Sequence, residues 1–249
     1  MLRHYRRRRT RARRQVVAVK KQWYYLMCVI VFLGVLIGSF LPQVSDTVAR
    51  TTGTYTATGQ AAEALAQLKV VDNPRPSRHY KRDYFGFRQT DDDGNGCDVR
   101  EDVLARDLAD VRYKSLTSCR VASGVLNDPY TGKTIHFKRG IDTSRAVQID
   151  HVVALSNAWK SGAYAWNTAR RYEFGNDTYN LLAVDGPANQ QKEDASADEW
   201  LPSNTAYACS YVARQIGVKT KYQLSVTTSE KNAMLKVLHG CSNQVLPAR

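Results

Sequence analysis

The chain has 249 residues and a formal net charge of +13, with 43% hydrophobic and 24% charged residues. This length is sufficient for one or two domains with a sizeable core. The composition excludes a disordered polymer, a collagen-like chain and a multi-pass membrane protein.

The positive charge is concentrated at the N-terminus. Residues 1–21 contain ten Lys or Arg and no acidic residue. Removing these ten charges from the net +13 leaves +3 for the remaining 228 residues. The high net charge is therefore mainly a property of this tail, and it is poor evidence that the folded part binds nucleic acid.

An uncharged run of 19 residues follows the basic tail, from Trp23 to Leu41, and is ended by Pro42. As a helix with a rise of ~1.5 Å per residue it spans roughly 28 Å, about one hydrocarbon core. The basic block predicts that residues 1–21 are a cytoplasmic tail and that residues 22–41 cross the membrane, as a retained anchor or as a cleaved signal segment. Either alternative places the rest of the chain outside the cytoplasmic membrane, as a single-pass or a secreted protein.

The cysteines agree with export. Cys28 lies inside the apolar run, and four others remain, namely Cys97, Cys119, Cys209 and Cys241. An even number of cysteines in an exported domain predicts disulfides, and their spacing matches no zinc site. Of the three possible pairings, we favour the sequential one, Cys97–Cys119 and Cys209–Cys241.

The chain after the apolar run predicts an α+β domain with little sheet. Residues 42–79 are expected to be a stalk or linker that includes a short helix at 60–69, and residues 80–241 the globular domain, followed by a tail at 242–249. Hydrophobic periodicity and turn residues predict helices at 99–110, 153–173 with a break at Gly162, from about 188, 207–222 and 228–239, and short strands at 121–126, 133–137, 147–150 and 181–184.

Five polar residues fall at particular points of this pattern. Asp150 and His151 end one predicted strand, and Asn180 directly precedes the next. Asn189 and Lys192 lie in the first turns of the helix that follows. A ribbon of two strands packed on that helix would direct Asp150, His151 and Asn189 into one cleft.

The pattern IDHVVALSNAW … NLLAVDGPANQQK resembles the HNH endonuclease superfamily, which has the ββα-metal fold. More narrowly, it is similar to exported bacterial HNH-family proteins related to the C-terminal domain of the GmrSD restriction endonuclease. The segments GNGCDVREDVLARDL, LNDPYTGKTIHFKRG and AYACSYVARQIGVKTKY fit the same group. The resemblance covers about residues 80–241.

The resemblance implies a metal-dependent endonuclease and gives each polar residue a role. His151 would be the general base that takes a proton from water. Asp150 and Asn189 would hold one divalent cation through hard oxygen ligands, which suit Mg²⁺. Asn180 would fix the loop between the strands through backbone hydrogen bonds and so support catalysis. Lys192 would contact the scissile phosphate, or would be a solvated helix charge.

The implied partners are the membrane, through the N-terminal helix, and nucleic acid, with DNA favoured and little sequence preference; no obligate protein partner is evident. Five cations outside the site can follow a DNA backbone or can be ordinary surface charges. They are His136, Lys138, Arg139, Arg170 and Arg171.

Alternative functions remain open at this point. A non-catalytic cell-envelope protein could use the same fold to bind DNA or a wall component, and a hydrolase of another phosphoester or of a wall polymer is a third possibility. The acidic stretch from Asp91 to Asp102 partly matches a calcium-loop template, but it ends in Asp rather than Glu and follows no clear helix. A solvated turn is therefore the favoured interpretation of this stretch.

Overall fold

The computed structural model describes residues 23–41, 45–91, 94–141 and 143–248. Contacts divide the chain into two units, Met1–Tyr55 and Thr56–Arg249. The predicted basic tail, residues 1–21, lies outside the described residues.

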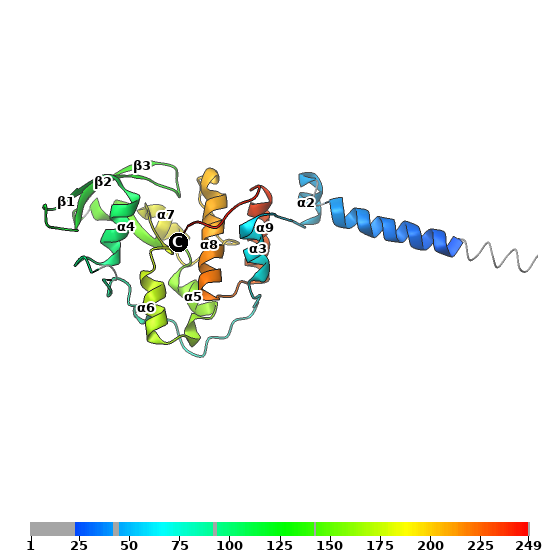
Figure 1. Ribbon diagram of the computed structural model, residues 1–249, viewed down its shortest axis with the longest axis horizontal. Helices are drawn as coiled ribbons and strands as arrows, with labels where there is room; N and C mark the ends of the chain where they lie inside the picture. The colour runs from blue at the N-terminus through cyan, green and yellow to red at the C-terminus, as the bar shows by residue number, and fades with distance from the viewer. Residues whose placement is uncertain (1–22, 42–44, 92–93, 142, 249) are drawn as a thin grey trace, which may run out of the picture. The chain divides into compact units, whose positions relative to one another are not determined.

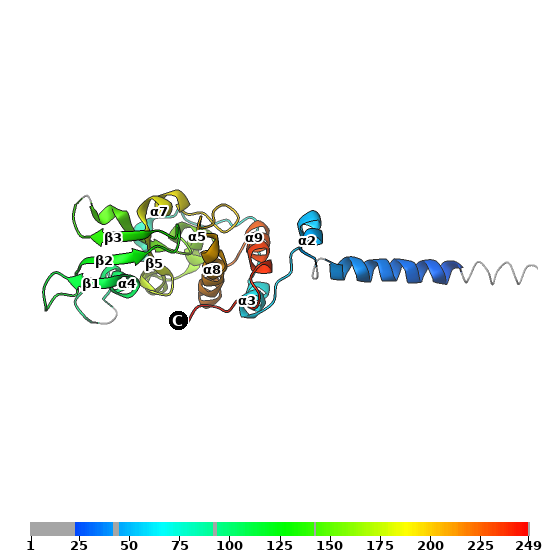
Figure 2. The same ribbon diagram turned by 90° about the horizontal axis from the view of Figure 1, so that it is seen from above.

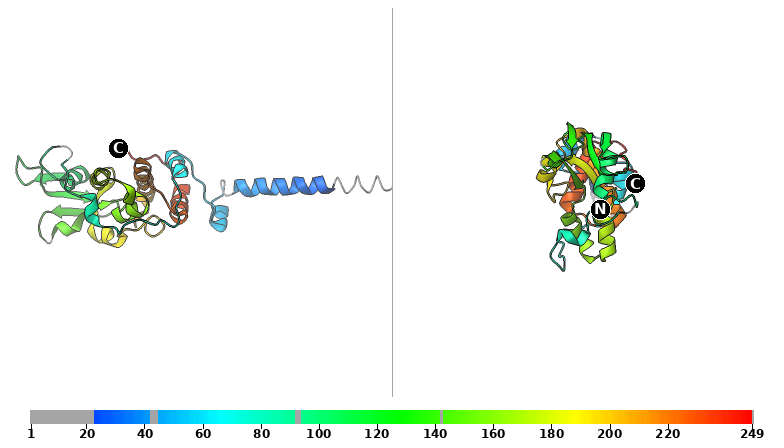
Figure 3. Two further views of the ribbon diagram at one scale, coloured as in Figure 1. Left: turned by 90° about the horizontal axis from the view of Figure 1, so that it is seen from below. Right: turned by 90° about the vertical axis from the view of Figure 1, so that its left-hand side faces the viewer.

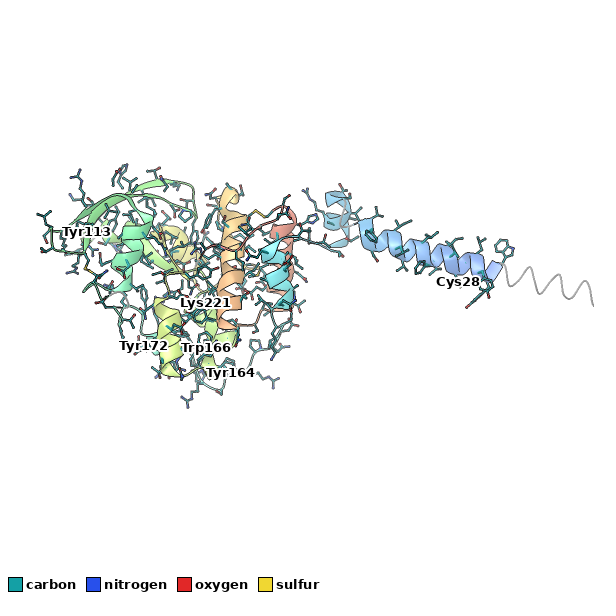
Figure 4. All side chains as sticks on the ribbon, in the orientation of Figure 1. Cys28, Tyr113, Tyr164, Trp166, Tyr172 and Lys221 are labelled. Atoms are coloured by element: carbon teal, nitrogen blue, oxygen red, sulfur yellow. A yellow bond between two sulfur atoms is a disulfide. The ribbon has the colours of Figure 1, made fainter. Side chains whose placement is uncertain are left out.

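The first unit contains the apolar helix Trp23–Leu41 and the short helix α2 (Asp46–Thr52). The apolar helix is long enough to cross a membrane and has a mean hydropathy of 2.4, and its side chains are exposed along its length. Its free cysteine, Cys28, is exposed as well (Figure 4). A signal sequence near the N-terminus can meet the same criteria of length and hydropathy, so the choice between anchor and signal stays a prediction.

The second unit is a mixed α+β domain, as expected (Figure 1). Its helices are α3 (Gln60–Gln67), α4 (Val99–Asp107), α5 (Leu155–Lys160), α6 (Thr168–Asn176), α7 (Gly186–Lys192), α8 (Ala208–Tyr222) and α9 (Thr228–His239). Its strands are β1 (Ala109–Tyr113), β2 (Val121–Asn127), β3 (Thr134–Lys138), β4 (Val147–His151) and β5 (Leu181–Asp185). Short 3-10 turns are η1 (Arg82–Phe85), η2 (Thr143–Ala146), η3 (Ala163–Ala165) and η4 (Thr205–Tyr207).

The strands form two antiparallel groups, a sheet in the order β1-β2-β3 and a ribbon of β4 and β5. The sheet lies at one end of the second unit, and α3 and α9 lie at the other (Figures 2 and 3). Strand β1 was not predicted, because its residues, ADVRY, carry little apolar pattern and partly continue the predicted helix 99–110. The helix ends at Asp107 instead, because Leu108 adopts an extended conformation that starts the strand.

The β4–β5 ribbon is buried on both faces, which explains why β5 reads as a continuous apolar run. Leu181 and Ala183 pack in one cluster with residues of α4, β2 and β3. The alternate residues, Leu182 and Val184, pack in another cluster with residues of α3, α8 and α9. Because side chains alternate across a strand, the ribbon packs against one cluster on each face. This packing fixes the position of the ends of the ribbon.

The compact unit begins earlier than the expected boundary at residue 80. Ala61 and Leu65 of α3 are fully buried in the cluster with α8 and α9, although they lie in the predicted stalk or linker, residues 42–79. The predicted tail, residues 242–249, pairs with α3, since Ala61 N donates to the Gln244 carbonyl. A helix this short requires such a partner for its apolar face.

Two disulfides are present, Cys97–Cys119 and Cys209–Cys241, and they confirm the sequential pairing. The first joins Cys97, two residues before α4, to the connection between β1 and β2. The second joins the first turn of α8 to Cys241, two residues after α9. Each therefore links elements that pack together in the fold.

Candidate active site

A cleft of ≈ 400 Å³ opens beside the end of β4. It brings together three of the residues that sequence analysis selected, Asp150 and His151 on β4 and Asn189 on α7. The other lining residues come from η1 and the chain just before it, from β4, from α5 and the residue before it, and from the chain after α7. They are Tyr80, Arg82, Ile149, Ala154, Leu155, Ser156, Glu193 and Asp194.

The ribbon and α7 bring Asp150, His151 and Asn189 to the cleft, as the predicted order of strand, strand and helix suggested. Asp150 lies opposite Leu182 and His151 opposite Leu181 in the antiparallel register. Asp185 then ends β5 and caps α7, because its side chain accepts a hydrogen bond from Ala188 N. Since α7 contacts both strands, its Asn189 faces the cleft at the end of β4.

His151 is held in one tautomer by the backbone. Its Nε2 lies 2.9 Å from the Gly175 carbonyl oxygen. A carbonyl only accepts, so Nε2 carries the proton and donates. Burial lowers the pKa of His151 to about 3, so the imidazole is neutral near pH 7. The lone pair is therefore on Nδ1, which has no hydrogen-bond partner among the described residues.

Asn180 fixes the chain that leaves β4. Its Oδ1 accepts from Val153 N at 2.8 Å, and its Nδ2 donates to the Val153 carbonyl at 3.1 Å. The Asn180 side chain is fully buried and does not line the cleft. These are backbone hydrogen bonds of the kind expected from the resemblance, and a contribution to catalysis stays a prediction.

Asp150 is clamped by two buried side chains. Lys192 Nζ donates to Oδ1 at 2.9 Å, and the Tyr130 hydroxyl donates to Oδ2 at 2.5 Å. Lys192 also donates to the His151 carbonyl at 3.0 Å. Burial raises the pKa of Asp150, while the Lys192 charge and both hydrogen bonds act in the opposite direction. The clamp thus stabilises a carboxylate that is only 5% exposed.

Lys192 differs from both sequence-based expectations. Its side chain is 0% exposed, so it is not a solvated helix charge. It does not line the cleft either, since its ammonium group points to Asp150 and the end of β4. The contacts of Lys192 are thus with Asp150 and the His151 carbonyl, behind the cleft rather than on its surface.

Tyr130 was missed by sequence analysis. It follows the Asp128-Pro129 turn between β2 and β3, a context that predicts a turn and nothing more. Its ring is fully buried and packs edge-on against Trp200 and Tyr211, with ring centroids 5.0 and 5.6 Å away. This packing against residues from distant parts of the chain holds the hydroxyl beside Asp150.

The cleft contains oxygen donors that suit a hard divalent cation. Asn189 Nδ2 donates to Gln148 Oε1 at 2.9 Å, which leaves Oδ1 with no partner among the described residues. Asp150 lines the same cleft, and each of its oxygens keeps a second lone pair. The described residues hold no group of three or more His, Cys, Asp or Glu placed to bind a metal. A carboxylate and an amide oxygen nevertheless fit Mg²⁺, which keeps several waters and binds substrate oxygens.

Arg82 is the cation among the residues that line the cleft, and no sequence pattern pointed to it. It lies in η1, 65 residues before the first residue of β4, and is exposed. Its charge helps to lower the pKa values of both His151 and Asp150. At the cleft wall its guanidinium group is suited to an anionic substrate.

Two acidic residues after α7 complete the cleft rim. Asp194 pairs with Lys160 at 3.0 Å. Glu193 is exposed and has φ 50° and ψ −120°, a conformation that favours glycine. Both follow the α7 helix directly, so their position depends on where that helix ends.

Three of the arginines considered for DNA binding have structural roles instead. Arg139 forms an ion pair with the buried Glu101 at 2.6 Å. Arg170 donates to the Tyr222 carbonyl, and Arg171 to the Trp166 carbonyl. These contacts use part of the hydrogen-bonding capacity of each guanidinium group. His136 and Lys138, in contrast, are exposed on β3.

The acidic stretch before α4 is a turn that uses its own polar groups. Asp91 accepts from Gly96 N, and the Asn95 side chain donates to Asp102. Asp93 lies outside the described residues. The hydrogen bonds agree with the predicted turn.

Comparison with known proteins places this site in a family. Residues 98–237 match GmrSD restriction endonucleases, C-terminal domain. The chain belongs to this family. The GmrSD C-terminal domain is HNH-like, which agrees with the β4–β5–α7 arrangement and with an α+β fold of the ββα-metal type. The matched range contains Asp150, His151, Asn180, Asn189 and Lys192.

A relative of this GmrSD-type chain occurs in the fungus Arthroderma benhamiae. It is 40% identical over 182 residues, which is 72% of this chain and 84% of the relative, and it is described as an "Uncharacterized secreted protein". The expected bacterial origin of the group thus stays a prediction. No solved structure matches.

Proposed function

We propose that the protein is a metal-dependent HNH endonuclease that hydrolyses phosphodiester bonds in nucleic acid. The observation that carries this proposal is the state of His151. Its tautomer is set by the Gly175 carbonyl, its ring is neutral, and it lines a cleft that also presents oxygen donors and Arg82. Family membership supports nuclease chemistry of this kind.

In the proposed reaction, His151 Nδ1 takes the proton from a water that attacks the scissile phosphorus. Its position beside the phosphate depends on the Nε2 hydrogen bond, which fixes the plane of the ring. Arg82 binds a non-bridging phosphate oxygen and orients the strand. Asp150 and Asn189 would hold Mg²⁺, which when bound would stabilise charge on the phosphate and on the leaving 3′ oxygen. The products would carry 5′-phosphate ends.

The test is plasmid nicking by the full chain in detergent, with Mg²⁺ or with EDTA. We expect nicking in Mg²⁺ and none in EDTA. A His151→Ala variant should lose roughly 10²–10⁴-fold in rate, the usual contribution of a general base. His79→Ala is the matched control, since His79 is exposed and outside the cleft, and it should nick like the wild type.

Nicking by His151→Ala at the wild-type rate would remove His151 from the assigned role. A wild-type chain that binds DNA but never cleaves it would instead favour the non-catalytic cell-envelope protein that uses the same fold.

We also propose that the nuclease acts outside the cytoplasmic membrane. The apolar N-terminal helix supports export, and the relative described as secreted agrees with it. The disulfides point in the same direction, because they persist in oxidising compartments. A substrate outside the cell would be DNA or RNA released by other cells.

A further inference from the structure

The β1-β2-β3 sheet presents a basic, solvent-facing surface that the cleft does not use. Register places Arg112 of β1 opposite Ser123 of β2, and Ser123 opposite Lys138 of β3. Directly paired residues share a face, so the two cations lie on one side, roughly 10 Å apart across two strand spacings. His136 lies on the same side, opposite Val125.

The other side of the sheet is the core side. Phe137, between His136 and Lys138, is 2% exposed and packs with Leu126 and with Val147 of β4. Since side chains alternate along a strand, His136 and Lys138 of β3 point to the outer surface.

The outer surface is hollowed. A depression of ≈ 570 Å³ runs over all three strands, and small side chains on β2 form its floor. Arg112, Lys114, His136 and Lys138 lie around it, together with Arg139, which is paired with Glu101. Asp110 is the acidic residue that lines it.

The cations around this depression are available to a ligand. The side chains of Arg112, Lys114 and Lys138 are exposed and make no hydrogen bond or ion pair to any residue in the described part of the chain. This contrasts with Arg170 and Arg171, which are used by backbone carbonyls. Unpaired cations around a concave floor of small residues are complementary to a polyanion.

We propose that this sheet surface binds the phosphate backbone of nucleic acid, as a second contact in addition to the cleft. The inference rests on the proposed function, since it names how the nuclease holds its substrate. The sheet is connected to the site through η2, which joins β3 to β4 and contacts β3, β4 and α7. Contacts to phosphates carry no sequence information, so binding here would be sequence-tolerant.

The test measures binding of a labelled 20-base-pair DNA duplex by fluorescence anisotropy, in EDTA, over a range of salt concentrations. The variant is Arg112→Gln with Lys138→Gln, which removes two charges from exposed side chains. We expect affinity to fall by about tenfold and the slope of log K against log salt to fall by about 2. The control, Arg75→Gln with Lys236→Gln, removes the same charge from exposed residues outside the depression and should change affinity less than twofold.

Equal losses in the two double variants would overturn the proposal, because net charge alone would then explain the effect. Unchanged DNA affinity in the sheet variant would overturn it as well. An anionic membrane is the rival ligand, because Leu116 and Ile141 near this sheet are almost fully exposed. If the sheet variant keeps its DNA affinity but loses binding to phosphatidylglycerol vesicles, the surface binds lipid and the proposal is overturned.

The outcome is separable from that of the proposed function. If the sheet variant binds and nicks like the wild type while His151→Ala is inactive, the sheet proposal fails and the nuclease stands. If His151→Ala nicks normally, the assigned mechanism fails whatever the sheet binds.

Discussion

Lys192 is a buried charge that contacts two residues of the candidate site without lining the cleft. It is the cationic partner of Asp150 and also donates to the His151 carbonyl, so it links α7 to the last two residues of β4. A buried ion pair contributes little relative to a well-packed apolar pair, but removal of one partner leaves an uncompensated charge.

We therefore expect Lys192→Met to lower the free energy of unfolding by about 3–5 kcal/mol. The substitution keeps most of the side-chain length but removes the positive charge that pairs with the Asp150 carboxylate. Lys236→Met, at an exposed position of α9, is the control and should change stability by less than about 0.5 kcal/mol. Urea titration measures the free energy of unfolding of both variants. Similar losses in the two would contradict a stabilising contact between Lys192 and Asp150.

His151 predicts a particular dependence of stability on pH. Its pKa is about 3 in the folded protein and near 6.5 when unfolded. Between these values the unfolded chain binds more protons, so the contribution of His151 to stability is present above pH 6.5 and is lost as the pH falls toward 3.

A comparison with His151→Asn isolates this effect from other titrating groups, including Asp150. The difference in unfolding free energy between wild type and variant should shrink as the pH is lowered from 7 to 4, measured in EDTA. A constant difference would show that the imidazole titrates normally in the folded state.

At the scale of elements, α6 supplies the carbonyl that sets the His151 tautomer, and a close approach fixes its position. A Cβ added at Gly175 would lie 2.3 Å from the Phe85 carbonyl oxygen, so α6 and η1 touch through backbone at this point. Only glycine fits at this position, because there is no space for a side chain.

Gly175→Ala should therefore destabilise the domain by about 1–3 kcal/mol and also slow nicking, because α6 must move away from η1 and its carbonyl from His151. Gly240→Ala is the matched control, since its added Cβ would meet the nearest atom at an ordinary 3.6 Å. Thermal unfolding and nicking rates are compared. Normal stability and rate in Gly175→Ala would mean that the contact is easily relaxed.

The ribbon and α7 could be predicted because their signals are local. Asp150 and His151 end an apolar strand, and Asn189 follows the second strand at a fixed short interval. Arg82 and Tyr130 could not be predicted, because they reach the site through packing between segments that are far apart in the chain. Strand β1 was hidden for a different reason: it is paired on one side only and lacks a buried apolar stripe.

At the scale of the whole molecule, the cysteines distinguish a retained anchor from a cleaved signal. The four cysteines of the domain are paired, and Cys28 on the apolar helix is free. Alkylation of the denatured, unreduced protein should thus label one cysteine if the helix is kept, and none if it has been removed.

Intact mass spectrometry of protein from its native host reads both the label and the chain length. One label on a full-length chain indicates an anchor, and no label on a shortened chain indicates secretion after cleavage. Five labels would contradict export, because they would show that the disulfides never formed.

The pairing of α3 with the end of the chain has a consequence for engineering. Thr58 contacts Asn243, and Ala61 bonds to Gln244, so the domain starts and finishes at neighbouring points on its surface. Adjacent termini of this kind allow a domain to be spliced into a loop of a host protein or to be circularly permuted. The domain could therefore be carried as an insert, with both of its junctions on the same side.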